Sequence, residues 1–391
     1  MVQAACRSPQ GPAALPNSPP GPIADPIAAV LAQTIAIDMH NHVYPVGTEP
    51  HRGRPPQAPA GPPQAPGPGA SPGPGGAPPP GRPPSEDLPG PTLGLQDALA
   101  RSGFSAVCAS FVLDFAPSEQ PGDARATLLR WFKAVDAQLD ASQLRRALTA
   151  QDLRAAHDHA RPTIVQTVEG SMFIEGQLDR VEEVYRLGLR HLQLLHERDD
   201  LVSPLGDVNT GPARLGGLTA MGADVIRECN RLGILVDLAH ASHETVAAAL
   251  KLATRPVVVS HTSLDSWTGG DPATFARMQP RLISKPHAKV VADAGGVIGV
   301  WTHLASSLPL FVESIKAMAD AVGVDHVGIG SDTDLLSSRG TDYTWPGERG
   351  FFPAVVGEML RQGFSPDDIA KIGGGNYVRV FGSATAGSDK G

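Results

Sequence analysis

The sequence is poor in cysteine, with only three in 391 residues. Cys6, Cys108 and Cys229 lie far apart in the chain, and no CxxC pair occurs. Their number and spacing argue against a disulfide-stapled scaffold and against a zinc site built from thiolates. Cys108 falls in a run of strand character and Cys229 in a run of helical character, so we expect both to be small core residues.

Long apolar runs and an excess of positive charge are also lacking. No stretch of about eighteen apolar residues occurs, so no transmembrane helix is expected. The N-terminus has no basic segment followed by an apolar one, so we expect no signal peptide, and a cytoplasmic location is the default. The net charge of -8 gives no basic face for nucleic acid.

Glycine and proline are abundant, with 43 and 38 residues, and much of this excess lies in one segment. Residues 47–92 are of low complexity and have too little apolar surface to offset their ordering entropy. We expect an extended or disordered insertion there, either a tolerated surface loop or a lid or proline-rich docking segment. Around it we expect a loosely ordered leader over residues 1–34, a single domain over 35–382 and a flexible tail over 383–391.

Outside the insertion, short apolar runs alternate with helical segments, which is the pattern of a parallel sheet. Eight runs have strand character: 35–40, 104–112, 163–169, 189–196, 234–240, 256–261, 296–301 and 326–332. Eight strand–helix units predict a (β/α)₈ TIM barrel. A doubly wound open sheet is the alternative, and it is disfavoured because neither GxGxxG nor a P-loop follows the first strand.

The stretch Ile234–His261 shows how such strands deliver polar side chains. Its first strand ends in His240, Ser242 begins a helix as its N-cap, and the next strand ends in His261. In a barrel the carboxyl ends of the strands meet at one mouth, where ligands bind. One such histidine is also explained as a hydrogen-bonded residue at a strand end, but two on consecutive strands predict a shared metal site.

The other predicted strand ends add imidazoles and carboxylates to this mouth. They supply His40, His42, Glu169, His196, Trp301 and Asp332. Imidazole and carboxylate are typical ligands of zinc and similar divalent metals, and the set exceeds what one ion needs. We therefore predict two metal ions bridged by Glu169, with Asp332 placed to hold or deprotonate a water molecule.

Two members of this set have alternative explanations, because His42 can face solvent and Asp332 can cap a turn. His243 is expected at the surface. The remaining histidines outside the predicted strand ends are interpreted as unrelated to metal: His51, His157, His159, His287, His303 and His326.

Five segments resemble the membrane (renal) dipeptidase family, peptidase family M19. They follow the family's order and cover most of the chain outside the leader and the insertion. Four of them hold predicted site residues, and the fifth is a C-terminal GGN motif: TVEGSMFIEGQLDRVEEVYRLGLRHLQLLH, GLTAMGADVIRECNRLGILVDLAHAS, RPVVVSHTS, GVDHVGIGSDTD and IGGGNYVRVF.

The resemblance implies a binuclear zinc dipeptidase that uses a metal-bridging hydroxide and also accepts a D-residue at the C-terminal position. His40 would hold one zinc ion, His240 and His261 would complete the other, and Glu169 would bridge both. Two Zn²⁺ are the implied cofactor, with another divalent metal as the alternative. A dipeptide is the implied partner, and the family often forms homodimers.

The resemblance also implies roles in the reaction. His196 would polarise the substrate carbonyl as it becomes an oxyanion, and Asp332 would orient the hydroxide and shuttle its proton to the leaving amine. Arg281 would grip the terminal carboxylate of the substrate, for which a rigid guanidinium is suited.

The chain departs from the family pattern at two of these places. His42 stands where the family usually has aspartate, which removes a negative charge from the site, although histidine can also bind zinc. Leu282 replaces the asparagine beside the arginine. These changes leave open another hydrolase of amidohydrolase type, acting on an N-acyl amino acid, a lactone or a cyclic amide. A family member that binds a ligand without catalysis is the alternative from another class.

Overall fold

The computed structural model describes residues 25–43, 94–114, 120–197, 203–336 and 350–386. The predicted insertion at 47–92 and most of the predicted leader lie outside these ranges. The end of the leader, however, is a helix, α1 (Pro26–Gln33), which begins at the N-cap Asp25 and buries Val30 in the core. The predicted tail boundary is also too early, because α14 (Asn376–Thr385) continues through residue 385.

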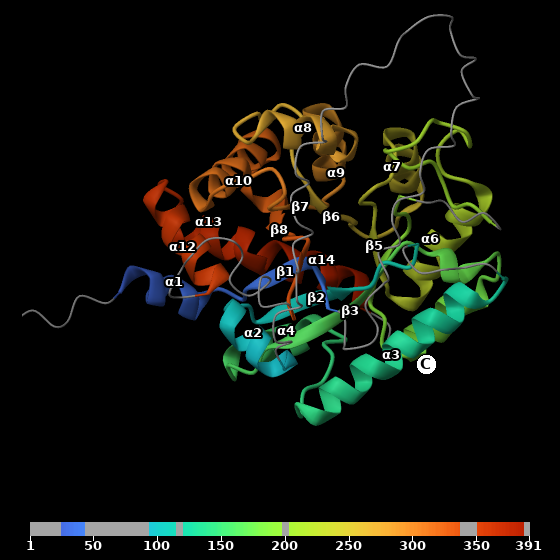
Figure 1. Ribbon diagram of the computed structural model, residues 1–391, viewed down its shortest axis with the longest axis horizontal. Coiled ribbons are helices and arrows are strands. Elements are labelled where there is room, and N and C mark those ends of the chain that lie inside the picture. Colours follow the sequence, from blue (N-terminus) through green and yellow to red (C-terminus); the bar gives the residue numbers. More distant parts are fainter. Residues whose placement is uncertain (1–24, 44–93, 115–119, 198–202, 337–349, 387–391) are drawn as a thin grey trace, which may run out of the picture.

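Eight parallel strands form a closed barrel, as predicted (Figure 1). Each strand pairs with the next, β8 pairs with β1, and the additional pairing of β1 with β2 closes the ring. The strands lie within about two residues of the predicted runs or inside them: β1 (Ile37–His42), β2 (Ala106–Ser110), β3 (Thr163–Glu169), β4 (His191–Gln193), β5 (Leu235–Asp237), β6 (Val258–Thr262), β7 (Val297–Val300) and β8 (Val327–Ile329).

Helices surround the strands (Figure 1). They are α2 (Leu95–Ser102), α3 (Asp123–Ala141), α4 (Ala150–Asp158), α5 (Asp179–Arg186), α6 (Ala220–Leu232), α7 (His243–Leu252), α8 (Pro272–Met278), α9 (Lys285–Asp293), α10 (Leu308–Val322), α12 (Phe351–Arg361) and α13 (Pro366–Ala370). Helix α7 begins after Ser242, whose side chain accepts a hydrogen bond from the N–H of Thr245, as its composition predicts.

The core has two parts because successive side chains of a strand point to opposite faces. One part lies between the strands and the outer helices and includes Val107, Ile164 and Val236. The other includes Met39 and Cys108 together with residues of α14. Helix α14 contacts β5, β7 and β8, and its Tyr377 lies 3.2 Å from Nδ1 of His191 in β4. Apolar packing therefore fills the part of the barrel against α14.

Three irregularities in strand pairing occur where the predicted site residues lie. Between Asp38 and Asn41, β1 has one residue more than β2, and between Val259 and Thr262, β6 has one more than β7. After β8, a short strand β9 (Thr333–Asp334) also pairs with β1, and the segment from Ile329 to Thr333 has one residue more than β1. Such bulges bend a strand and redirect its side chains.

Candidate metal centre

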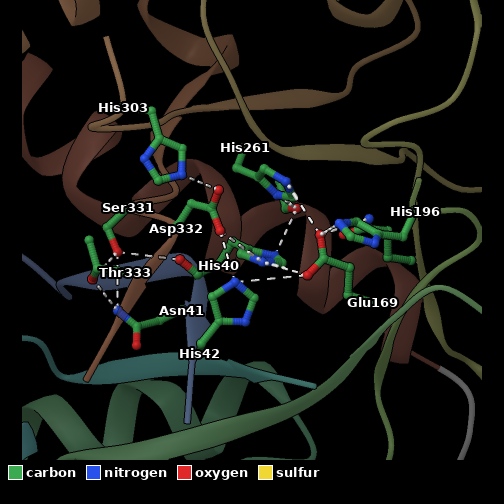
Figure 2. Close-up of polar contacts among 12 residues, drawn as sticks. His40, Asn41, His42, Glu169, His196, His261, His303, Ser331, Asp332 and Thr333 are labelled. Carbon is green, nitrogen blue, oxygen red and sulfur yellow. Dashed lines mark hydrogen bonds and ion pairs between the residues drawn. The ribbon is translucent and has the colours of Figure 1, made fainter. Parts of the chain in front are cut away.

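The structure brings all seven predicted metal-site and catalytic side chains of the strand ends together at one end of the barrel (Figure 2). Five are buried and two, His42 and Asp332, are partly exposed. The set is His40, His42, Glu169, His196, His240, His261 and Asp332. The alternative in which His42 simply faces solvent is therefore wrong, because its Nε2 lies 3.0 Å from Oδ1 of Asp332.

Glu169 is the centre of this cluster, and its two carboxylate oxygens face different histidines. Oε2 lies 3.4 Å from Nε2 of His40 and 3.9 Å from Nε2 of His42. Oε1 lies 3.4 Å from Nε2 of His240 and 3.6 Å from Nε2 of His261. A carboxylate with an imidazole pair at each oxygen has the arrangement needed to bridge two cations.

The buried polar atoms of the cluster fit a metal better than they fit each other. Nε2 of His40 and Oε2 of Glu169 are buried and have no hydrogen-bond partner in the part of the chain that the structure describes, although buried polar atoms normally have one. Nε2 of His240 and Nε2 of His261 face each other at 2.9 Å. Three overlapping groups of three ligand atoms, each group within 4.8 Å, include these residues with His42, His196 and Asp332. The donor set is of the type that zinc takes.

The charges within the cluster also favour a bound cation. Burial raises the pKa of Glu169, but the nearby His196 and His40 outweigh it and hold that pKa well below its usual range. Burial lowers the pKa of His40, yet Glu169 raises it overall to about 9. Burial and the charge of His40 keep the pKa of His261 well below normal. The ionised Glu169 thus needs a positive partner, which a divalent cation supplies in place of protons.

His196 has a partner that the sequence did not reveal. Its Nδ1 lies 2.7 and 2.8 Å from the two carboxylate oxygens of Asp114, which is buried beyond the end of β2. Its Nε2 lies 3.5 Å from Oε1 of Glu169. Asp114 therefore fixes the ring orientation of His196 and keeps Nε2 toward the cluster. The only sequence signal was an acidic residue just after a predicted strand.

Asp332 lies in the irregular segment between β8 and β9 and has a left-handed backbone, with φ of 56°. His240 shares this feature, with φ of 64°. Such conformations are strained for residues other than glycine and cluster at functional sites. Around Asp332, the backbone N–H donates to the carbonyl of His40 at 3.0 Å. Asp38 supports the same segment, because it accepts hydrogen bonds from the N–H and hydroxyl of Ser331.

His303 contacts Asp332 as well, although the sequence set this histidine apart from the site. Its Nε2 lies 2.7 Å from Oδ2 of Asp332 (Figure 2). Burial lowers the pKa of His303, but the Asp332 charge outweighs burial and raises it overall. No strand-end pattern marked His303, which comes two residues after Trp301. The prediction that His303 is unrelated to metal did not include this contact with Asp332.

A cavity of about 380 Å³ opens beside His240 and His261. Arg281 is the one arginine or lysine among its described lining residues, which include Asp265, His243 and His287. The Arg281 guanidinium forms an ion pair with Glu197, which directly follows His196 in the chain. The predicted carboxylate-binding arginine is therefore at the cavity, but it already has an internal carboxylate as partner.

A closed parallel barrel with imidazoles and carboxylates gathered at its strand ends defines the class of metal-binding (β/α)₈ barrels. Within that class, the chain belongs to the membrane dipeptidase family, peptidase family M19, whose family model matches residues 96–390. No helix in the described ranges combines the length and apolarity needed to cross a membrane.

Two curated relatives are fungal dipeptidases. The chain is 31% identical over 224 residues to dipeptidase verJ of Clonostachys rogersoniana, covering 55% of this chain and 54% of verJ. It is 28% identical over 244 residues to dipeptidase aclJ of Aspergillus oryzae (strain ATCC 42149 / RIB 40), covering 58% of this chain and 52% of aclJ. The chain thus matches about half the length of these relatives.

Solved structures share the fold at low identity. The probable dipeptidase PvdM of Pseudomonas aeruginosa aligns with a TM-score of 0.67 at 16% identity, covering 92% of this chain and 97% of PvdM. A metallo peptidase of Rhodobacter sphaeroides, liganded with a phosphinate mimic of the dipeptide L-Ala-D-Ala, aligns with a TM-score of 0.62 at 19% identity. The alignment covers 75% of this chain and 90% of the peptidase.

Proposed function

We propose that this protein is a binuclear zinc dipeptidase. The observation that carries the proposal is the position of Glu169, whose two oxygens face two separate sets of imidazoles. In this assignment, His40 and His42 belong to one ion and His240 and His261 to the other. When bound, such a pair of ions polarises the scissile carbonyl and generates a water-derived nucleophile at neutral pH.

The protein's own residues position the substrate and move the proton. Arg281 binds the terminal carboxylate of a dipeptide in the cavity beside His240 and His261. The substrate carboxylate then displaces Glu197 from the guanidinium or shares the guanidinium with it. In its protonated form, His196 donates from Nδ1 to Asp114, which orients the ring, and from Nε2 to the carbonyl oxygen as negative charge develops there. Asp332 accepts the proton of the attacking water at its carboxylate and passes it to the leaving amine.

We further propose that a D-residue is accepted at the C-terminal position. The Rhodobacter sphaeroides peptidase of the same fold binds a mimic of L-Ala-D-Ala, which supports including such substrates. Histidine at position 42, where the family usually has aspartate, permits a second candidate, hydrolysis of a lactone or cyclic amide.

Metal analysis and a substrate panel test the proposal together. Gently purified protein is expected to contain about two zinc ions per chain, which is the usual content of a two-metal site. It should release amino acids from dipeptides, and His240→Ala should abolish this activity with only a modest loss of thermal stability. Protein without metal contradicts the binuclear site. Activity on lactones without activity on any L,L- or L,D-dipeptide selects the second candidate.

A further inference from the structure

His303 reaches Asp332 from a loop that follows β7. The loop is tied to the segment before Asp332, because the hydroxyl of Thr302 donates to the carbonyl of Ser331 at 3.0 Å and its N–H donates to the same oxygen at 3.4 Å. His303 then places Nε2 at 2.7 Å from Oδ2 of Asp332. Hydrogen bonds between the preceding residues, Thr302 and Ser331, therefore hold His303 and Asp332 close together.

The two oxygens of Asp332 have different neighbours. Oδ2 faces His303, while Oδ1 lies 3.0 Å from Nε2 of His42 and 3.7 Å from Nε2 of His40 (Figure 2). One oxygen is thus turned to the outer loop and the other to the metal-binding histidines. This division matters because the terminal torsion of aspartate is broad and does not by itself fix the carboxylate plane.

We propose that His303 is a positioning residue for Asp332, holding Oδ2 so that Oδ1 stays directed at the metal centre. The inference rests on the proposed function, in which Asp332 carries the proton. His42 cannot perform this task in the loaded protein, because an imidazole that binds a metal through Nε2 has no proton on that nitrogen. Among the described residues that contact the Asp332 carboxylate, His303 is then the side chain outside the proposed metal ligands.

His303 is exposed enough to be replaced with little effect on packing. Its side chain is 38% exposed, so replacing the ring leaves little buried volume empty. The nearest aromatic neighbour with a ring contact is Trp301, at 5.0 Å between centroids. A substitution at position 303 should therefore act mainly through the hydrogen bond to Asp332.

The experiment compares His303→Leu, which removes the donor, with His303→Gln, which retains an N–H donor on a side chain of similar reach. We expect the leucine variant to lower kcat for a dipeptide by about tenfold or more, as for other residues that orient a reacting group, with KM and zinc content nearly unchanged. The glutamine variant should recover most of kcat. His159→Leu, which replaces an exposed histidine at the end of α4, is the matched control and should match the wild type.

Each outcome bears on one claim. Full kcat in His303→Leu, or equal losses in the leucine and glutamine variants, overturns the positioning role. Loss of zinc or a lower melting temperature in parallel with kcat shows a structural role and also overturns it. A wild type that holds zinc but cleaves no dipeptide removes the proposed function itself, and the positioning role with it.

Discussion

The individual residues of this site divide into those fixed by strand ends and those fixed by loops. His40, Glu169, His240 and His261 were predictable because a parallel barrel brings strand ends together whatever the loops do. Asp114, Glu197 and His303 were not, since their contacts depend on loop conformations that no periodic pattern encodes. The side chains closest to the predicted ions were thus predicted better than their supporting partners.

Substitution of His42 tests whether this side chain binds a metal ion. Its Nε2 lies near Asp332 and Glu169, so an aspartate at position 42 should offer a carboxylate to the same ion. We expect His42→Asp to retain two zinc ions, whereas His42→Ala should bind one of them at least about tenfold more weakly. Zinc titration followed by metal analysis after dialysis measures both. Equal zinc retention in the alanine variant shows that His42 is not a ligand.

Glu197 competes with the substrate in the proposed function, because it pairs with the Arg281 guanidinium that a substrate carboxylate is proposed to bind. Both partners are partly exposed, so their ion pair is expected to be weak. Glu197→Gln should lower KM for dipeptides by about threefold, as expected on removing such a competitor. The KM for the corresponding dipeptide amides should not change.

The matched control is Glu182→Gln, which breaks a surface pairing with Arg186 and Arg231 and should leave both values unchanged. An equal effect of Glu197→Gln on dipeptides and amides argues against competition for Arg281.

Among secondary-structure elements, the eight strands were predictable from their apolar runs, and most helices from their periodicity. Helices α4 and α8 are harder to predict from the sequence. Helix α4 begins with a capping box formed by Thr149 and Asp152, and α8 begins at Pro272 after the N-cap Asp271. Both signals are present in the sequence, but both helices are short and carry few buried residues. The strand bulges could not be predicted, because register depends on the neighbouring strand.

Two glycines allow β7 and the end of β8 to approach β6 closely. A Cβ atom at Gly299 of β7, or at Gly330 after β8, would lie 1.8 Å from the carbonyl oxygen of Ser260, next to His261. Gly330→Ala must therefore displace β6. We expect a loss of about 1–3 kcal/mol in the free energy of unfolding, as in overpacked cores, together with weaker zinc binding.

Urea denaturation of the metal-free protein separates the two effects. Gly94→Ala is the control, since the nearest neighbour of its added Cβ lies at 4.0 Å. Stability equal to the wild type in Gly330→Ala would contradict the close approach.

For the whole molecule, eight strand–helix units without GxGxxG or a P-loop after the first strand favoured a closed barrel over an open sheet. They did not predict the contacts between distant segments. His191 of β4 contacts Tyr377 of α14 and Asp237 of the neighbouring strand β5. The contact of His191 with Tyr377 joins positions 186 residues apart, so no local pattern in the sequence predicts it.

The pH dependence of unfolding gives a prediction for the whole molecule. Burial and the nearby His243 lower the pKa of His287 from 6.5 to about 4. Above pH 6.5 the residue is neutral in both states. Between pH 6.5 and about 4 the unfolded chain binds a proton that the folded chain does not, so the free energy of unfolding falls as pH falls.

Relative to His287→Gln, the wild type should lose about 2–3 kcal/mol over this interval. Denaturation of both metal-free proteins at several pH values measures the difference. Histidines that do not interact with His287 cancel because both proteins contain them, whereas His243 lies beside it. Parallel pH profiles for the two proteins would contradict a half-buried, neutral His287.

The bulges in β1, in β6 and after β8 also bear on how such a site can change over time. Side chains alternate between the faces of a strand, so deleting one residue from a bulge restores regular pairing and reverses the direction of the side chains beyond the deletion. His40, His261 and Asp332 lie within these irregular segments. A single-residue deletion can therefore remove a ligand while the hydrogen-bonded ring persists. The barrel and the candidate metal centre can in this way be changed separately by mutation.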